Sequence, residues 1–176
     1  IRIRGTECTD DRDGELWMTG YTCGFCRACL QNLIDGKYDF LNGIIVSDGC
    51  MVVQRIYDHW AVIGNTVCKL NINVPRNHDA LAVKYFTDEL QLLKVEMEKL
   101  SGRQITDEAL NASIDLYNET RALIRELFAL MKGNSPVVTG TEMLQWTIRA
   151  MSMPKELYNE ELKKFINEAK KREPLK

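Results

Sequence analysis

Six cysteines are the residues of this 176-residue chain whose type and spacing point most directly to chemistry. Four of them, Cys23, Cys26, Cys29 and Cys50, fall in one short stretch. Clustered cysteines in a chain without a secretory signal indicate metal or redox chemistry before they indicate disulfides. This stretch is therefore the first candidate for a functional site.

The spacing of Cys23, Cys26 and Cys29 is that of the C-x₂-C-x₂-C run of bacterial ferredoxins, but the surroundings do not fit. No Cys-Pro follows at the ferredoxin distance, and residues 21–34 have helical character. Each step of three residues on an α-helix turns the side chain by about 300°. We therefore expect Cys26 and Cys29 to be packing thiols turned away from Cys23, with supplementary ligation left open. A zinc ribbon is also disfavoured, because it needs two separate C-x₂-C pairs and the chain has one overlapping run.

Cys23 and Cys50 share a setting, because each stands at the start of a predicted helix. Free backbone N–H groups and the helix dipole stabilise a thiolate there. Cys50 also follows an apolar, β-branched run at residues 44–46, which is typical of a buried parallel strand. Open α/β sheets bind ligands outside the carboxyl ends of their strands. We therefore expect Cys23 and Cys50 to lie along one sheet edge and to hold one metal centre.

The elements that position these cysteines form an α/β pattern. We predict helices at residues 21–34 and 50–63 and strands at residues 39–47 and 67–74, preceded by a polar loop at residues 6–14. This order predicts a partial parallel sheet flanked by helices. Two or three parallel strands leave uncovered edges, so we expect further strands from outside this sequence.

The second half of the chain is predicted to be all helical. Helices are expected at residues 78–100, after Thr106 as an N-cap, at residues 141–151 and after Pro154. The helix after Thr106 carries an apolar stripe at 3.6-residue spacing, which we expect to be buried against helix 78–100. The stripe consists of Leu110, Ile114, Tyr117, Ile124 and Phe128.

Two domains follow from this pattern: residues 1–75, a partial α/β domain that binds the metal centre, and residues 76–176, a helical region. The chain has 23 basic and 25 acidic side chains, and this balance argues against a nucleic-acid-binding surface.

No apolar run approaches the roughly 20 residues that a membrane crossing needs, so we expect a cytoplasmic protein. No GxxxxGK[ST] phosphate loop is present, so ATP use by the chain itself is not expected.

Three stretches carry a family resemblance: residues 21–30 (YTCGFCRACL), 36–50 (GKYDFLNGIIVSDGC) and 55–60 (RIYDHW). Together with later segments up to the final helices, they resemble the N-terminal domain of subunits of the 2-hydroxyacyl-CoA dehydratase / benzoyl-CoA reductase family. The resemblance implies that Cys23 and Cys50 are two of three cysteines that hold a [4Fe-4S] cluster. The third would lie in a second α/β domain, which this sequence does not contain. One departure is Met51, where family members often have Asp.

The resemblance also implies a function: an iron–sulfur subunit of an anaerobic radical enzyme that acts on a CoA thioester. Its partners would be a homologous, non-identical subunit, forming a heterodimer, and an ATP-dependent iron–sulfur activator that delivers low-potential electrons. Residues 100–121 resemble a benzoyl-CoA reductase small subunit, which favours reduction of an aromatic ring. The alternatives are a subunit of an (R)-2-hydroxyacyl-CoA dehydratase, which eliminates water through a ketyl radical, and a non-catalytic electron-transfer or scaffold subunit.

Two further residues near the cysteines are open to two interpretations each. His59 could deliver a proton near a thioester, or pack as a hydrogen-bonded histidine. Asp48 could hydrogen-bond the cluster or substrate, or simply form the turn after the strand.

Overall fold

The chain divides into two compact units. The computed structural model describes residues 2–64, 66–132 and 134–174. One unit is Ile3–Gln104, and the other runs from Ile105 onward and includes Arg2. Among the described residues, no helix is long and apolar enough to cross a membrane. The functional division at residue 75 stays a prediction.

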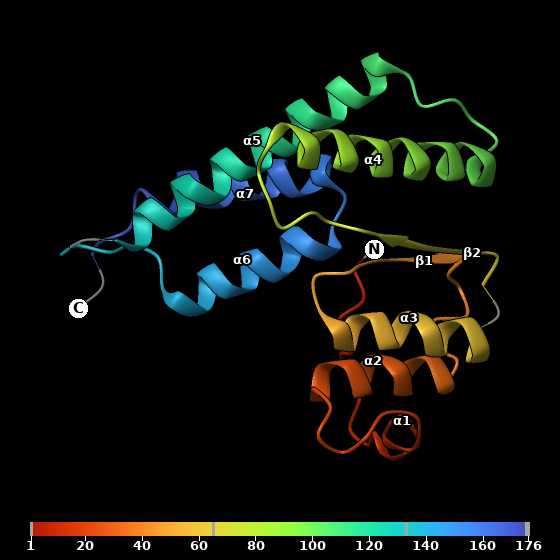
Figure 1. Ribbon diagram of the computed structural model, residues 1–176. Helices are drawn as coiled ribbons and strands as arrows, with labels where there is room; N and C mark the ends of the chain where they lie inside the picture. The colour runs from red at the N-terminus through yellow and green to blue at the C-terminus, as the bar shows by residue number, and fades with distance from the viewer. Residues whose placement is uncertain (1, 65, 133, 175–176) are drawn as a thin grey trace. The chain divides into compact units, whose positions relative to one another are not determined.

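A parallel pair of strands lies in the first unit (Figure 1). Strand β1 (Gly43–Ser47) pairs in register with β2 (Cys68–Ile72), and α3 (Met51–Ile63) connects them. Gly43 permits the close pairing, since a Cβ there would lie 2.6 Å from the Cys68 carbonyl oxygen. The expected partial parallel sheet flanked by helices is confirmed, with two strands in the part of the chain that the structure describes.

The helices of this unit are layered on the sheet. Helix α3 contacts both strands, α2 (Gly24–Ile34) packs on α3, and α1 (Arg12–Trp17) packs on α2, as Figure 1 shows. Helix α4 (Ala80–Ser101) contacts β2. Trp60 of α3 is fully buried at the centre of this core. The other buried members of the core are Met18, Cys26, Cys29, Leu30, Leu33, Ile44 and Ile56.

Helix α1 corrects the predicted polar loop at residues 6–14, because Arg12–Trp17 is helical. A helix of six residues is too short to show a hydrophobic period. It is stabilised by tertiary contact: Gly14 is buried, and a Cβ there would lie 2.7 Å from the Arg27 carbonyl oxygen of α2. Close approach to α2, rather than local propensity, accounts for this helix.

The second unit contains α5 (Asp107–Met131), α6 (Gly140–Ser152) and α7 (Lys155–Ala169). Thr106 is confirmed as an N-cap, since its side chain accepts a hydrogen bond from the Ala109 backbone N–H. The three helices share one apolar core. Its buried members are Leu123, Leu127, Val138, Trp146, Tyr158, Leu162, Ile166 and Ala169.

The predicted buried stripe of α5 is wrong by about one residue, or about 100° around the helix. Leu110, Ile114, Tyr117 and Phe128 are exposed, and Ile124 is half-buried against the core of the second unit. The buried face carries Thr120, Leu123 and Leu127 instead. Apolar residues occupy both faces of α5, so its period alone does not select the face that meets α6 and α7. A polar contact also marks the true face: the Thr120 hydroxyl donates to the Asn159 carboxamide oxygen of α7 at 2.7 Å.

A pair of leucine substitutions on α5 tests this corrected face. Leu127→Ala removes a fully buried side chain and should lower the free energy of unfolding by about 2–4 kcal/mol. Leu110→Ala, at an exposed position, should cost less than about 1 kcal/mol. Urea unfolding followed by circular dichroism measures both. A larger loss of unfolding free energy for Leu110→Ala than for Leu127→Ala would instead support the buried face predicted from the sequence.

Candidate functional site

Cys23 and Cys50 occupy equivalent positions on neighbouring helices. Cys23 is the N-cap residue of α2, and Cys50 is the N-cap residue of α3. Both are exposed, and neither side chain makes a capping hydrogen bond. Each sulfur therefore stands at the positive end of a helix dipole, and neither caps a backbone N–H of its helix. Both thiols are therefore accessible to a ligand.

Cys26 lies close to both of these cysteines, which differs from the expectation that it turns away from Cys23. Its side chain is 2% exposed. Burial first, then the Cys23 and Cys50 thiols and a hydrogen bond with Cys23, raise the pKa of Cys26 to about 11. Residues three apart are neighbours on a helix surface, and Cys23 precedes the first turn, so this proximity follows from helix geometry. The first turn of α2 therefore lies beside the start of α3.

Cys29, three residues after Cys26 on α2, is a buried member of the core of this unit. It is 1% exposed, and burial, followed by Cys26, raises its pKa to about 12. Tyr38 hydrogen-bonds its side chain. Cys29 thus has the burial expected of a packing thiol. Cys8 and Cys68 are both half-buried, and the Cys8 thiol donates to the Asp10 carbonyl oxygen at 3.4 Å.

Asp48, just before Cys50, joins the carboxyl ends of the two strands. Its backbone N–H donates to the Ile72 carbonyl at 3.2 Å, and its carboxylate accepts from the Val74 N–H at 2.8 Å. Beside it, the backbone N–H and side-chain amide of Asn73 donate to one Glu89 carboxylate oxygen of α4, at 3.0 and 3.1 Å. Of the two interpretations of Asp48, the structure supports the turn. The two contacts of Asp48 fix the segment that leads into Cys50 to the end of β2.

A pocket of about 450 Å³ opens next to the cysteines, between the end of α1 and the first turns of α3. Thr22 precedes Cys23 and Met51 follows Cys50, and both line it. The other lining residues are Trp17, Met18, Thr19, Val52, Gln54, Arg55 and His59. His59 packs edge-on against Trp17, with ring centroids 5.7 Å apart. This contact agrees with the interpretation of His59 as a packing residue.

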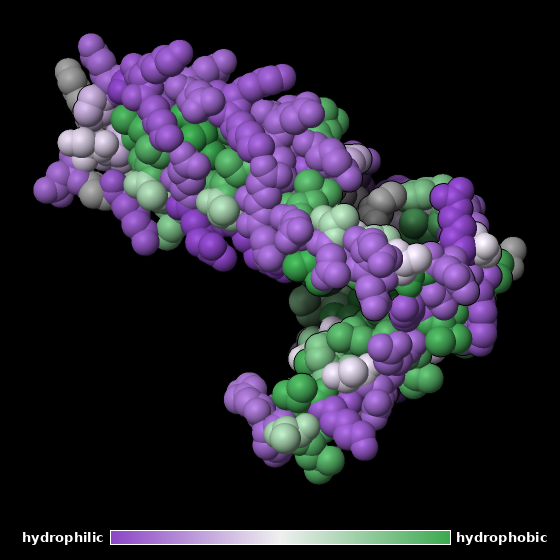
Figure 2. All heavy atoms as spheres, turned by 90° about the horizontal axis from the view of Figure 1, so that it is seen from above, coloured by the Kyte–Doolittle hydropathy of each residue, from purple (hydrophilic) through white to green (hydrophobic). Residues whose placement is uncertain are grey.

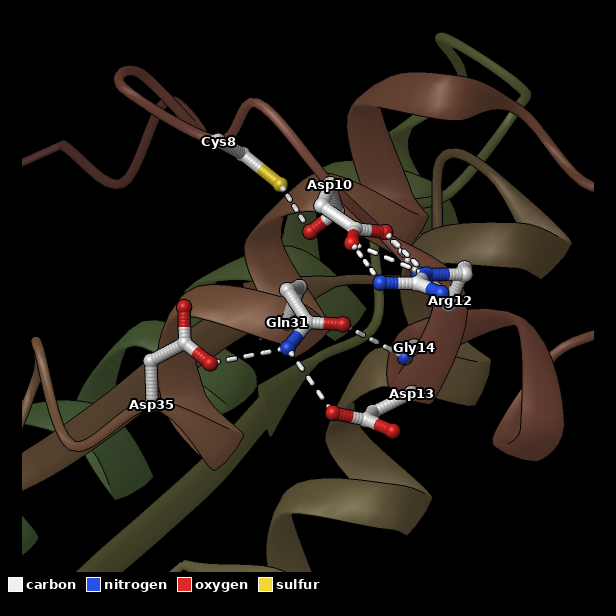
Figure 3. A network of polar contacts seen from close by, with 7 residues as sticks. All are labelled: Cys8, Asp10, Arg12, Asp13, Gly14, Gln31 and Asp35. Atoms are coloured by element: carbon white, nitrogen blue, oxygen red, sulfur yellow. Dashed lines mark hydrogen bonds and ion pairs between the residues drawn. The ribbon is translucent and has the colours of Figure 1, made fainter.

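The wall of this pocket depends on a polar network that attaches α1 to α2 (Figure 3). Gln31 is buried, and its carboxamide oxygen accepts from the Gly14 N–H at 2.9 Å. Its amide group donates to Asp35 at 2.8 Å and to Asp13 at 3.4 Å. Buried amides hold their position when every polar atom is paired. Gln31 thereby fixes α1 and, with it, Trp17.

The sequence placed Cys23 and Cys50 at the starts of two helices but did not predict the pocket beside them. Its walls come from α1, which carried no helical period, and from α3 positions that look like ordinary surface. The one available signal was the position of Thr22 and Met51 directly next to the cysteines.

The donor set fits part of an iron–sulfur site. Cysteine thiolates are the usual ligands of such clusters. Cys23 and Cys50 offer two, both exposed, with a third sulfur beside them. Within residues 2–64, 66–132 and 134–174 there is no group of three or more His, Cys, Asp or Glu side chains arranged to hold a metal ion.

Comparison with known proteins gives a consistent set of relatives. The family model described as 2-hydroxyglutaryl-CoA dehydratase, D-component, matches residues 1–176. A subunit of benzoyl-CoA reductase from Thauera aromatica is 29% identical over 93% of this chain and 42% of its own length. The (R)-phenyllactyl-CoA dehydratase beta subunit of Clostridium sporogenes is 25% identical over 94% of this chain and 45% of its own. The lactoyl-CoA dehydratase beta subunit of Anaerotignum propionicum is 27% identical over 88% of this chain and 41% of its own. The chain thus spans less than half the length of each of these relatives.

The reactivity of the thiols tests this geometry. In the native chain at pH 8, iodoacetamide should modify Cys23 and Cys50 at least about 10-fold faster than Cys26 and Cys29, because the last two are buried and remain protonated. Mass spectrometry of timed digests measures the four rates.

In urea the four rates should become similar, which serves as the control. Native labelling of Cys26 at the rate of Cys23 would contradict the arrangement.

Proposed function

The chain belongs to the 2-hydroxyglutaryl-CoA dehydratase D-component family, and from this membership we propose that it is the cluster-binding part of a subunit that processes acyl-CoA thioesters. Cys23 and Cys50 would hold a [4Fe-4S] cluster together with a third cysteine outside this sequence. The observation that carries the proposal is the pair of exposed N-cap thiols on adjacent helices. The enzyme would be cytoplasmic.

Each residue of the site would have a defined task. Cys23 and Cys50 would bind iron as thiolates, and the two helix N-termini would stabilise the negative charge of the centre. Cys26 would stay a protonated thiol next to Cys23, since burial raises its pKa to about 11. Asp48, tied to Ile72 and Val74, would keep the Cys50 segment in place. When bound, the cluster supplies single-electron transfer at low potential.

Electron delivery and subunit pairing belong to the same proposal. An ATP-dependent iron–sulfur activator would supply the electrons, and a homologous partner subunit would complete the enzyme. Apolar side chains reach the surface on the face shown in Figure 2. On α4, Leu81, Val83 and Leu92 are 76%, 61% and 64% exposed. Exposed apolar side chains in this number favour burial against further protein, either the rest of the subunit or the partner.

We favour reduction of an aromatic thioester over dehydration. The benzoyl-CoA reductase subunit is the relative with the highest identity of those named above, at 29%, and the dehydratase subunits follow at 25–27%. A dehydratase subunit is the alternative within the family, and a non-catalytic electron-transfer subunit is the alternative of another class. An electron paramagnetic resonance (EPR) signal of this subunit that changes on adding benzoyl-CoA would support direct action on the thioester. An unchanged signal would favour electron transfer.

Serine substitutions in the complete subunit test the ligand assignment. Cys23→Ser and Cys50→Ser should each remove or severely reduce the [4Fe-4S] signal, because a serine hydroxyl is a far poorer ligand for iron than a thiolate. Iron content and EPR of anaerobically purified variants measure this.

Cys68→Ser, on β2, is the matched control and should keep the wild-type signal. Cys26→Ser and Cys29→Ser should have weak effects, since both thiols are buried. Loss of the cluster in Cys26→Ser together with its retention in Cys50→Ser would overturn the assignment.

A further inference from the structure

We propose that the pocket between α1 and α3 binds the aromatic acyl group of the thioester substrate; this rests on the proposed function of the subunit. The pocket, of about 450 Å³, lies within the usual range for small-molecule sites of roughly 300–1,000 Å³. All its lining residues belong to one compact unit, so its shape depends only on contacts within that unit.

The position of the pocket links it to the cysteines. Thr22 and Met51 are the sequence neighbours of Cys23 and Cys50, and both contribute to its wall. A group seated there would therefore lie beside the two helix N-termini. For a thioester, this places the acyl side of the molecule next to the sulfurs and leaves the CoA portion outside.

The chemistry of the wall favours a flat aromatic group. Trp17 presents an indole that is 44% exposed and already meets His59 edge-on at 5.7 Å. Aromatic rings attract further rings in edge-to-face or offset arrangements. Met18 and Met51 add thioethers, which make favourable contacts with ring edges and adapt to the shape of a ligand. An exposed tryptophan and the 80% exposed Met51 in one pocket are apolar surface that an aryl group would cover.

The charges of the pocket argue against an acyl chain that carries a second carboxylate. Arg55 is the charged residue of its wall, and its guanidinium pairs with the Asp58 carboxylate at 2.9 Å. An incoming carboxylate would meet the Asp58 charge next to Arg55. Thr19, Thr22 and Gln54 are neutral. The pocket therefore fits an uncharged ring better than a dicarboxylic acyl group.

Binding of two thioesters to the complete enzyme complex tests the proposal. Isothermal titration calorimetry under anaerobic conditions would give the Kd of benzoyl-CoA and of butyryl-CoA, which share the CoA portion. Trp17→Ala should raise the Kd of benzoyl-CoA about 10-fold, the effect of losing one aromatic contact and its buried area. The Kd of butyryl-CoA should change less than about 2-fold, and Trp17→Phe should recover most of the affinity for benzoyl-CoA.

Leu16→Ala is the matched control, since Leu16 precedes Trp17 on α1, is 83% exposed and lies outside this pocket. It should leave both Kd values unchanged. Equal losses for both thioesters in Trp17→Ala, or no loss for either, would overturn the pocket assignment, as would failure of the Trp17→Ala subunit to join its partner. Iron content is measured in parallel. A wild-type complex without iron, or without affinity for either thioester, would instead refute the proposed function.

Discussion

The parallel pairing of β1 with β2 is the constraint on which the site depends. Parallel strands need a crossover, and α3 provides it, so α3 must begin at the edge of the sheet where β1 ends. Cys50 occupies that junction as the N-cap residue. Gly43 allows the pairing by its close approach to Cys68, and Asp48 fastens the far end to Ile72 and Val74. The register of two short strands thus determines where one thiol stands.

The second thiol is placed by helix packing. Helix α2 lies against α3 through the core around Leu30 and Trp60, with its first turn next to the start of α3. The shared effect of Cys23 and Cys50 on the pKa of Cys26 reflects this neighbourhood. Neither helix could rotate without moving one thiol away from the other. Apolar packing behind the cysteines therefore sets the geometry of the polar chemistry in front of them.

The sequence predicted much of this arrangement, because the signals for these elements come from residues that are neighbours in the sequence. The β-branched run before Asp48 predicted β1, and the helical spacing around Cys23 and Cys50 predicted that each lies at the start of a helix. What it missed depends on tertiary contact. Helix α1 exists because Gly14 and Gln31 bring it onto α2, and six residues carry no period. The buried face of α5 was misjudged because apolar residues cover two faces, and only contact with α6 and α7 selects Leu123 and Leu127. The nearness of Cys26 to Cys23 was missed because the helix was expected to begin at residue 21, whereas it begins at Gly24 and Cys23 is its N-cap.

The central claim is that Cys23 and Cys50 share one iron–sulfur cluster. Anomalous diffraction at the iron edge, from crystals of the complete subunit grown without oxygen, tests it most directly. We predict one compact iron peak with density continuous to the sulfur atoms of both Cys23 and Cys50, and none continuous to Cys29 or Cys68. An iron peak held by other residues, with both N-cap thiols free, would contradict the claim.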